Sequence, residues 1–322
     1  AIAGPGIGGL ILSNFSWSYI FWINVPVGLV TILIGEKFLP KDITKTKEKI
    51  DFSGFACIAI AIMTFFGGIF LGQESGFGSL QSYLLFIIAV IALGLFIMVE
   101  RKRKSPLIKF AIFKNKIFTL SLLSAVLIFA SNFFVNVVIP FYLQDARKLS
   151  ASYAGLLMMV FPLLMVVGAP LSGYLTDKIG PGILTFGGLL LLCCTSLMYM
   201  FLDMNSPIWY YVIATAIMGL GNALFQSPNN TMVMSSVEKQ DLGVAGSMNS
   251  FARNLGMVIG IALSTTILYR GMSEAYGERV TTYLANRPDI FIVGMRETFF
   301  VAFLLCVAAF ILTILRFRKT TK

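Results

Sequence analysis

The chain has 322 residues, of which 57% are hydrophobic and only 12% charged, and its formal net charge is +10. Its mean hydropathy of +0.85 excludes an ordinary soluble domain, because a globular core cannot bury so much apolar surface, whereas a bilayer solvates it. A net positive charge of this size is also typical of nucleic-acid-binding proteins. The positions of the basic residues, described below, argue against that class.

Apolar segments long enough to cross a hydrocarbon core of ~30 Å recur along the chain. We expect nine full membrane-spanning helices, preceded by a shorter apolar segment at 1–12. The sequence therefore predicts an all-α, polytopic membrane protein. The expected spans are 20–38, 52–72, 82–99, 118–143, 152–175, 182–202, 208–226, 244–268 and 298–315.

The basic residues alternate between the two sides of these spans. Eighteen of the 25 Lys and Arg residues fall on one side, mainly in the segments 36–51 and 100–117 and in the C-terminal tail, and six fall on the other. Because basic loops face the cytoplasm, we expect a multi-pass protein of the cell membrane with a cytoplasmic C-terminus. The positive charge then indicates contact with anionic membrane lipid, and no nucleic-acid partner.

Two polar stretches divide the chain. Residues 39–51 are rich in lysine and predict a cytoplasmic linker, and residues 100–117 predict a second, basic linker with an amphipathic patch on the membrane surface. Two expected helices lie between them in 52–99, and six follow in 118–322. The polar segment 270–296 predicts an outer loop or a short helical hairpin over the outer mouth.

The four cysteines lie in apolar segments, without CxxC spacing, and the chain has no histidine. We interpret them as small buried hydrophobic residues and expect neither a metal nor a cofactor. The cysteines are Cys57, Cys193, Cys194 and Cys306.

The first ten residues, AIAGPGIGGL, place a proline and four glycines in an apolar segment. Glycines let a neighbouring helix approach closely, and Pro5 kinks a helix where buried neighbours tolerate it. Small-residue packing alone would account for this stretch. The pattern GP-x-x-GG followed by WSYIFWINVPVG, however, resembles the fifth and sixth helices of the 14-spanning drug:proton antiporters (EmrB/QacA type) of the major facilitator superfamily. The resemblance assigns an antiporter motif to Gly4, Pro5, Gly8 and Gly9.

A second motif, GYLTDKIGP at 173–181, resembles the cytoplasmic G-x-L-x-D-[KR]-x-G motif of that family. It implies a cytoplasmic gate, although a generic polar turn is the alternative interpretation. The implied gate residues are Gly173, Asp177, Lys178 and Gly180.

Segments 139–162 and 221–232 also resemble helix ends of this family, so the resemblance covers the whole chain. It implies that 1–38 is the remainder of an N-terminal helical bundle, that 52–99 holds two additional central helices, and that 118–322 is a C-terminal six-helix bundle. By the same comparison we expect the chain to lack the first four spans and the coupling acid that they carry.

Polar side chains recur four residues apart within three expected spans, and therefore share a helix face. In hydrocarbon such groups face protein or a water-filled cavity. Hydrogen bonding between helices is an equal alternative to substrate contact for the amides, whereas Arg253 requires a partner or water. The family fold implies that these residues border a central cavity with apolar walls from Phe129, Phe133 and others. The residues implied for the substrate cavity or coupling are Asn132, Asn136, Met158, Phe161, Asn222, Phe225, Gln226, Asn249 and Arg253.

The leading functional hypothesis is secondary-active efflux of amphipathic drugs or toxic compounds, cationic or neutral, in exchange for protons by alternating access. Whether an accessory protein takes part in efflux stays an open question at this point. A facilitator-type carrier for a siderophore, peptide or nutrient is the first alternative. A membrane-embedded enzyme is more remote, because the sequence has no HExxH, GxSxG, paired intramembrane acids or phosphate-binding loop.

Overall fold

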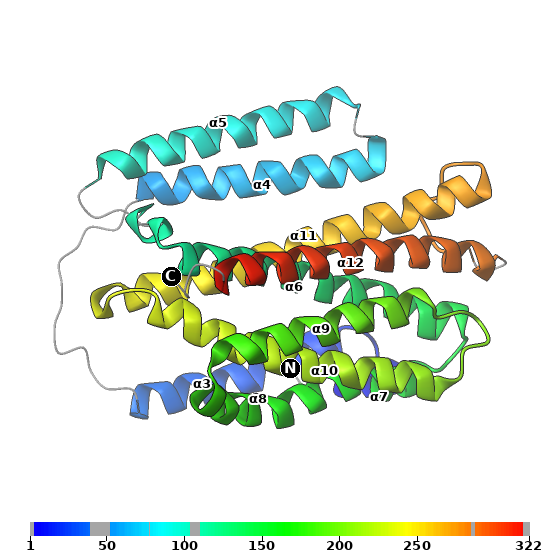
Figure 1. The fold of residues 1–322 in the computed structure, drawn as a ribbon. Helices are drawn as coiled ribbons and strands as arrows, with labels where there is room; N and C mark the ends of the chain where they lie inside the picture. Colours follow the sequence, from blue (N-terminus) through cyan, green and yellow to red (C-terminus); the bar gives the residue numbers. More distant parts are fainter. Residues whose placement is uncertain (1–2, 39–51, 77, 104–109, 285–286, 318–322) are drawn as a thin grey trace.

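The structure is a computed structural model, which describes residues 3–38, 52–76, 78–103, 110–284 and 287–317. Within these ranges every regular element is helical (Figure 1). Nine of the described helical segments are long and apolar enough to cross a membrane. The expectation of an all-α polytopic membrane protein is therefore confirmed.

The N-terminal and central elements are α1 (Ala3–Asn14), α2 (Tyr19–Trp22), α3 (Asn24–Phe38), α4 (Phe52–Ser75), α5 (Leu80–Lys102) and the 3-10 turn η1 (Phe110–Lys114). The remaining elements are α6 (Lys116–Pro140), the π-helical turn η2 (Phe141–Ala146), α7 (Ala151–Met158), α8 (Val160–Ile179), α9 (Pro181–Met200), α10 (Ile208–Ser235), η3 (Lys239–Asp241), α11 (Leu242–Tyr276) and α12 (Pro288–Phe317). The linker 39–51 and residues 104–109 of the second linker, which is expected to hold the amphipathic patch, lie outside the described residues.

Several helices extend beyond the apolar segments that predicted them. The span expected at 208–226 continues through Pro228 to Ser235, and α11 runs on to Tyr276. Since α12 already begins at Pro288, residues 270–276 and 288–296 of the segment expected as an outer loop or short helical hairpin continue the two long helices. The reason is that hydropathy marks only the hydrocarbon layer, whereas helical hydrogen bonding continues into the interface.

The C-terminal six spans pack around one large apolar core drawn from α6, η2, α7 and α9–α12. Tyr199 of α9 stacks on Phe299 of α12, with ring centroids 5.1 Å apart, and both are fully buried. Small residues bring helices close together: a Cβ added to Gly188 of α9 would lie 2.8 Å from the carbonyl oxygen of Gly221 on α10. Such contacts are how membrane helices gain van der Waals packing without a hydrophobic driving force.

Helices α4 and α5 form an antiparallel hairpin that lies alongside the bundle (Figure 1). The rings of Phe65 and Phe86 meet edge to face at 5.9 Å, and Arg103 Nη2 donates a hydrogen bond of 2.7 Å to Ser53 Oγ, which joins the two helix ends. The main contact of this hairpin with the bundle is between α4 and α11.

The N-terminal helices contact the bundle through α1, which packs on α7. Helix α3 has no buried residue at all, although it is long and apolar. Its apolar side chains are thus satisfied by lipid or by protein outside the described residues.

Polar contacts join different loops at the two ends of the bundle. At one end Asn115 Nδ2 donates to the Ser236 carbonyl at 2.6 Å. At the opposite end Arg147 Nη1 donates to the Ser206 carbonyl at 2.6 Å, and Tyr142 Oη to the Asp203 carbonyl at 2.7 Å. This grouping follows the alternation of loops that the sequence predicts. Which end faces the cytoplasm stays a prediction.

Candidate substrate cavity

A cavity of about 270 Å³ opens between α6, the α7–α8 segment and α10. Aromatic, methionine and aliphatic side chains supply most of its wall, and the polar part consists mainly of amides. Six of the residues predicted from sequence line it, together with Phe129 and Phe133. The six are Asn132, Asn136, Met158, Phe161, Asn222 and Gln226.

The polar centre of the cavity is a reciprocal pair of amides. Asn132 Nδ2 donates to Asn222 Oδ1 at 2.6 Å, and Asn222 Nδ2 donates back to Asn132 Oδ1 at 3.1 Å. The side chain of Asn136 is tied down as well, because its Nδ2 donates to the Asn132 carbonyl at 3.1 Å. For Asn132 and Asn222 the interhelical interpretation therefore holds, while the same amides form part of the cavity wall.

Gln226 differs from these asparagines. It lies one turn from Asn222 on α10 and lines the cavity, half-buried. Its amide makes no hydrogen bond to any other described residue. Both a donor and an acceptor are therefore available to a molecule in the cavity.

Phe225 does not take its predicted place. Its side chain is 1% exposed and belongs to the apolar core. A Cβ on Gly188 would lie 2.7 Å from the Phe225 backbone nitrogen, so this part of α10 faces α9. Neighbouring residues on a helix point in different directions, which is why Gln226 reaches the cavity and Phe225 does not.

The third predicted pair, Asn249 and Arg253, does not line the cavity. Asn249 Nδ2 donates to Asn230 Oδ1 at 2.8 Å, which joins α11 to α10. The Arg253 guanidinium lies over the ring of Phe129, 5.5 Å from its centroid, in a cation–π contact. Its Nε is buried and has no hydrogen-bond partner among the described residues.

A second arginine within the bundle escaped the sequence analysis, which placed it in the C-terminal tail. Arg316 lies in the last turn of α12 and is 2% exposed. Its Nη1 donates to Ser121 Oγ at 2.9 Å and to Asn229 Oδ1 at 3.2 Å, and thereby connects α6, α10 and α12. The only signal in the sequence is its position directly after a long apolar run.

The glycine motif lies in α1, and one of its glycines explains the contact with α7. A Cβ on Gly9 would lie 2.8 Å from the Ala151 carbonyl oxygen, and Ser152 Oγ donates to the Gly9 carbonyl at 3.5 Å. Gly8, by contrast, has no described atom within 4 Å of such a Cβ. The expected close packing is therefore seen at Gly9 and not at Gly8. Gly4 and Pro5 belong to α1, but their surroundings lie outside the described part.

The predicted gate residues lie at the α8–α9 junction. Gly180 ends α8 with a φ of +85°, a left-handed conformation that favours glycine. Asp177 is exposed and makes no hydrogen bond to any described residue, and Lys178 Nζ lies 4.5 Å from the ring centroid of Tyr174. Gly173 is not sterically restricted, since a Cβ there would meet Ser227 Oγ at an ordinary 3.8 Å.

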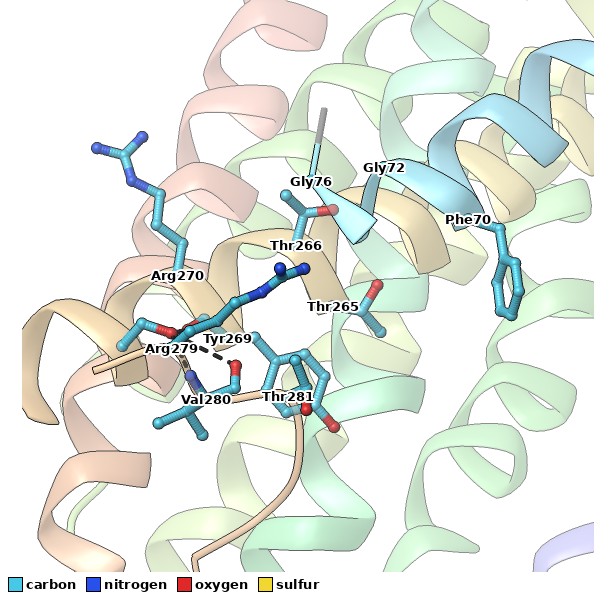
Figure 2. A pocket seen from close by; sticks show the side chains of 11 residues that line it. Phe70, Gly72, Gly76, Thr265, Thr266, Tyr269, Arg270, Arg279, Val280 and Thr281 are labelled. Carbon is cyan, nitrogen blue, oxygen red and sulfur yellow. Dashed lines mark hydrogen bonds between the residues drawn. The ribbon is translucent and has the colours of Figure 1, made fainter. Parts of the chain in front are cut away.

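A larger hollow, of about 680 Å³, lies between the end of α4 and α11 (Figure 2). Figure 2 shows the Arg279 side chain lying across it, while the Arg270 side chain points away. Arg270 Nε pairs with Glu274 Oε1 at 2.8 Å. The loop beneath it is held by Ser273 Oγ, which accepts a hydrogen bond from the Val280 backbone N–H at 2.9 Å. None of the cavity residues predicted from sequence lines this hollow, so the amide-lined cavity is the better candidate for a substrate site.

Comparison with known proteins places these features in a family. The model of the Major Facilitator Superfamily matches residues 1–261 and, in a second alignment, 121–322. The chain is 30% identical to riboflavin transporter RibZ of Clostridioides difficile (strain 630). This alignment of 322 residues covers all of this chain and 68% of that protein.

Two further relatives match most of the chain. Identity to the uncharacterized transporter YebQ of Escherichia coli (strain K12) is 34%, over 83% of this chain and 58% of that protein. Identity to the multidrug transporter protein MdtP of Bacillus subtilis (strain 168) is 28%, over 89% of this chain and 53% of that protein. The chain thus spans about half to two thirds of the length of these relatives. With its helical architecture and these matches, the chain belongs to the Major Facilitator Superfamily.

Proposed function

We propose that this chain forms part of a secondary-active exporter of amphipathic drugs or toxic compounds, driven by inward proton flow. The observation that carries the proposal is the cavity between α6, α7–α8 and α10, where aromatic and methionine side chains surround a small set of amides. Such walls bind many ligand shapes, because methionine is flexible and aromatic faces stack without strict geometry. Relatives named multidrug transporter and lincomycin resistance protein support this choice.

The mechanism that we propose is alternating access, in which two helical bundles rock about this cavity. The contact of Gly9 with Ala151 supports the assignment of an antiporter motif, because it holds α1 directly against α7. Asp177, exposed at the α8–α9 junction, is our candidate for a gate contact with the other bundle. We also propose the 14-spanning type, because the hairpin α4–α5 comes between the N-terminal helices and the six-span bundle in the sequence.

Proton coupling requires a group that binds a proton reachable from both sides in turn. None of the residues that line the cavity is an acid or a histidine. We therefore place the coupling group in the protein opposite this wall, and assign Arg253 the role of biasing its charge state.

A carrier for riboflavin is a second candidate, favoured by the 30% identity to RibZ along the whole chain. The same amide-lined cavity suits the polar edge of a flavin. The two candidates differ in direction and in the driving force.

The test uses everted membrane vesicles from cells that express the complete gene. Proton-driven export predicts that planar fluorescent compounds accumulate inside when the lumen is acidified, and that nigericin abolishes the accumulation. Vesicles carrying no transporter serve as the control. Accumulation that survives collapse of the gradient would contradict antiport, and exclusive movement of riboflavin into intact cells would favour the second candidate.

A further inference from the structure

The cavity wall formed by this chain has no charged side chain, but a cation lies against one of its rings. Its fifteen lining residues are all uncharged. The cation next to it is Arg253, whose guanidinium lies on Phe129, a ring that belongs to the wall. Among the described residues Arg253 has no carboxylate within 4.0 Å and no side-chain hydrogen bond, so no described residue neutralises its charge.

A positive charge beside an apolar cavity interacts electrostatically with a charged ligand that enters the cavity. Water screens charges poorly where side chains exclude it, and the effective dielectric constant falls well below that of bulk solvent. A positively charged molecule in the cavity is repelled by Arg253, whereas an anion or a neutral, electron-rich ring is tolerated or attracted. A positive charge at this place thus favours an anionic or neutral molecule over a cation.

The remaining polar groups indicate the shape of the ligand. The amides of Asn132 and Asn222 satisfy each other, so they present a flat, largely saturated surface. Gln226 keeps both a donor and an acceptor for a partner. Three phenylalanines and three methionines supply the apolar surface around them. A planar ring system with one hydrogen-bonding edge fits this arrangement.

We infer that the substrate class is a planar heteroaromatic compound with an amide-like edge and no positive charge, neutral or anionic. This inference rests on the proposed export function and narrows it, since multidrug export alone leaves the charge of the substrate open. Arg253 acts here as the residue that determines charge preference, and Gln226 as the residue that recognises the polar edge.

Binding is measured on the purified full-length protein in detergent by equilibrium dialysis, which does not depend on proton coupling. Three planar tricyclic fluorophores differ in charge: resorufin is an anion at neutral pH, lumichrome is neutral and proflavine is a cation. We expect resorufin and lumichrome to bind about tenfold more tightly than proflavine, equivalent to ~1.4 kcal/mol. Equal or tighter binding of proflavine overturns the inference, and this result needs no variant.

Variants then test the assigned residues. Arg253→Gln should shift the affinity ratio toward proflavine by about tenfold, Arg253→Lys should keep the original order, and Arg296→Gln removes an exposed charge elsewhere as a control. An unchanged ratio in Arg253→Gln overturns the role of Arg253, and unchanged lumichrome affinity in Gln226→Leu overturns that of Gln226. If the vesicles export proflavine under a proton gradient and the protein prefers it, the export function stands and this inference falls. If no fluorophore is bound or exported, both fail.

Discussion

The contact between α11 and α6 provides a sharp test of how the cavity wall is held in place. Gly256 of α11 faces the backbone of α6, where an added Cβ would lie 2.5 Å from the Val126 carbonyl oxygen and 2.9 Å from Phe129 Cβ. Cβ atoms essentially never approach another atom more closely than 3.0 Å. The substitution Gly256→Ala must therefore separate the two helices by about 0.5 Å locally, because a backbone carbonyl cannot rotate away.

Overpacking of this kind costs about 1–3 kcal/mol, and alanine returns up to ~1 kcal/mol through its greater helix propensity. Gly187→Ala on α9 provides the matched control, since no atom lies within 4 Å of its added Cβ. The control variant gains the propensity without the clash. The difference in unfolding free energy between the two variants should thus be about 1–3 kcal/mol.

The assay is thermal unfolding of both purified variants in the same detergent, followed by binding of resorufin at a temperature where both are folded. Gly256→Ala should melt several degrees below Gly187→Ala and should bind more weakly, because α6 carries Phe129 and Asn132 into the cavity. If the two variants melt together, the α6–α11 contact is looser than the structure indicates and the reasoning is refuted.

Three further predictions concern polar groups and topology. Asn222→Leu should lower stability by about 1–3 kcal/mol because Asn132 loses its partner, and the double replacement of both by leucine should recover part of that loss in thermal unfolding. The Asn205 backbone N–H and, to a smaller extent, the Ser206 hydroxyl lower the pKa of Asp203; its contribution to stability is therefore present above the unfolded pKa of ~3.9 and lost as pH falls through the lower folded value. Hydrogen exchange of the loop 201–207 should show this acid loosening, and Asp203→Asn should abolish it. Finally, Ala275→Cys should react with an impermeant maleimide on intact cells and Lys239→Cys only after permeabilisation; the reverse pattern would invert the topology.

The spans could be predicted because length and hydropathy alone determine which segments can cross a bilayer. Their ends could not, as α10 shows: its last turns, after Gln226, contain Pro228, Asn229 and Asn230, which are poor helix formers and carry no apolar signal. Tertiary contacts hold them in the helix, including the bond from Asn229 Nδ2 to the Ser121 carbonyl at 3.2 Å. No local pattern announces a partner on another helix.

The same distinction applies to the candidate site. Spacing of four residues predicts correctly that Asn132 and Asn136, or Asn222 and Gln226, share a face. It does not show that Asn132 and Asn222 bond to each other across helices 90 residues apart in sequence. Arg316 was missed for this reason too, because its burial depends on two partners, Ser121 and Asn229, that are remote in the chain.

The α4–α5 hairpin has a consequence for the history and synthesis of the protein. Its buried residues include Ala61, Ala92 and Phe96, and the described apolar cores of the bundle contain no residue from either helix. Because α4 packs far more extensively on α5 than on the bundle, the pair can associate in the membrane before the last six spans are made. Because no core position depends on it, residues 52–103 can be gained, lost or exchanged by recombination as one cassette without repacking the rest.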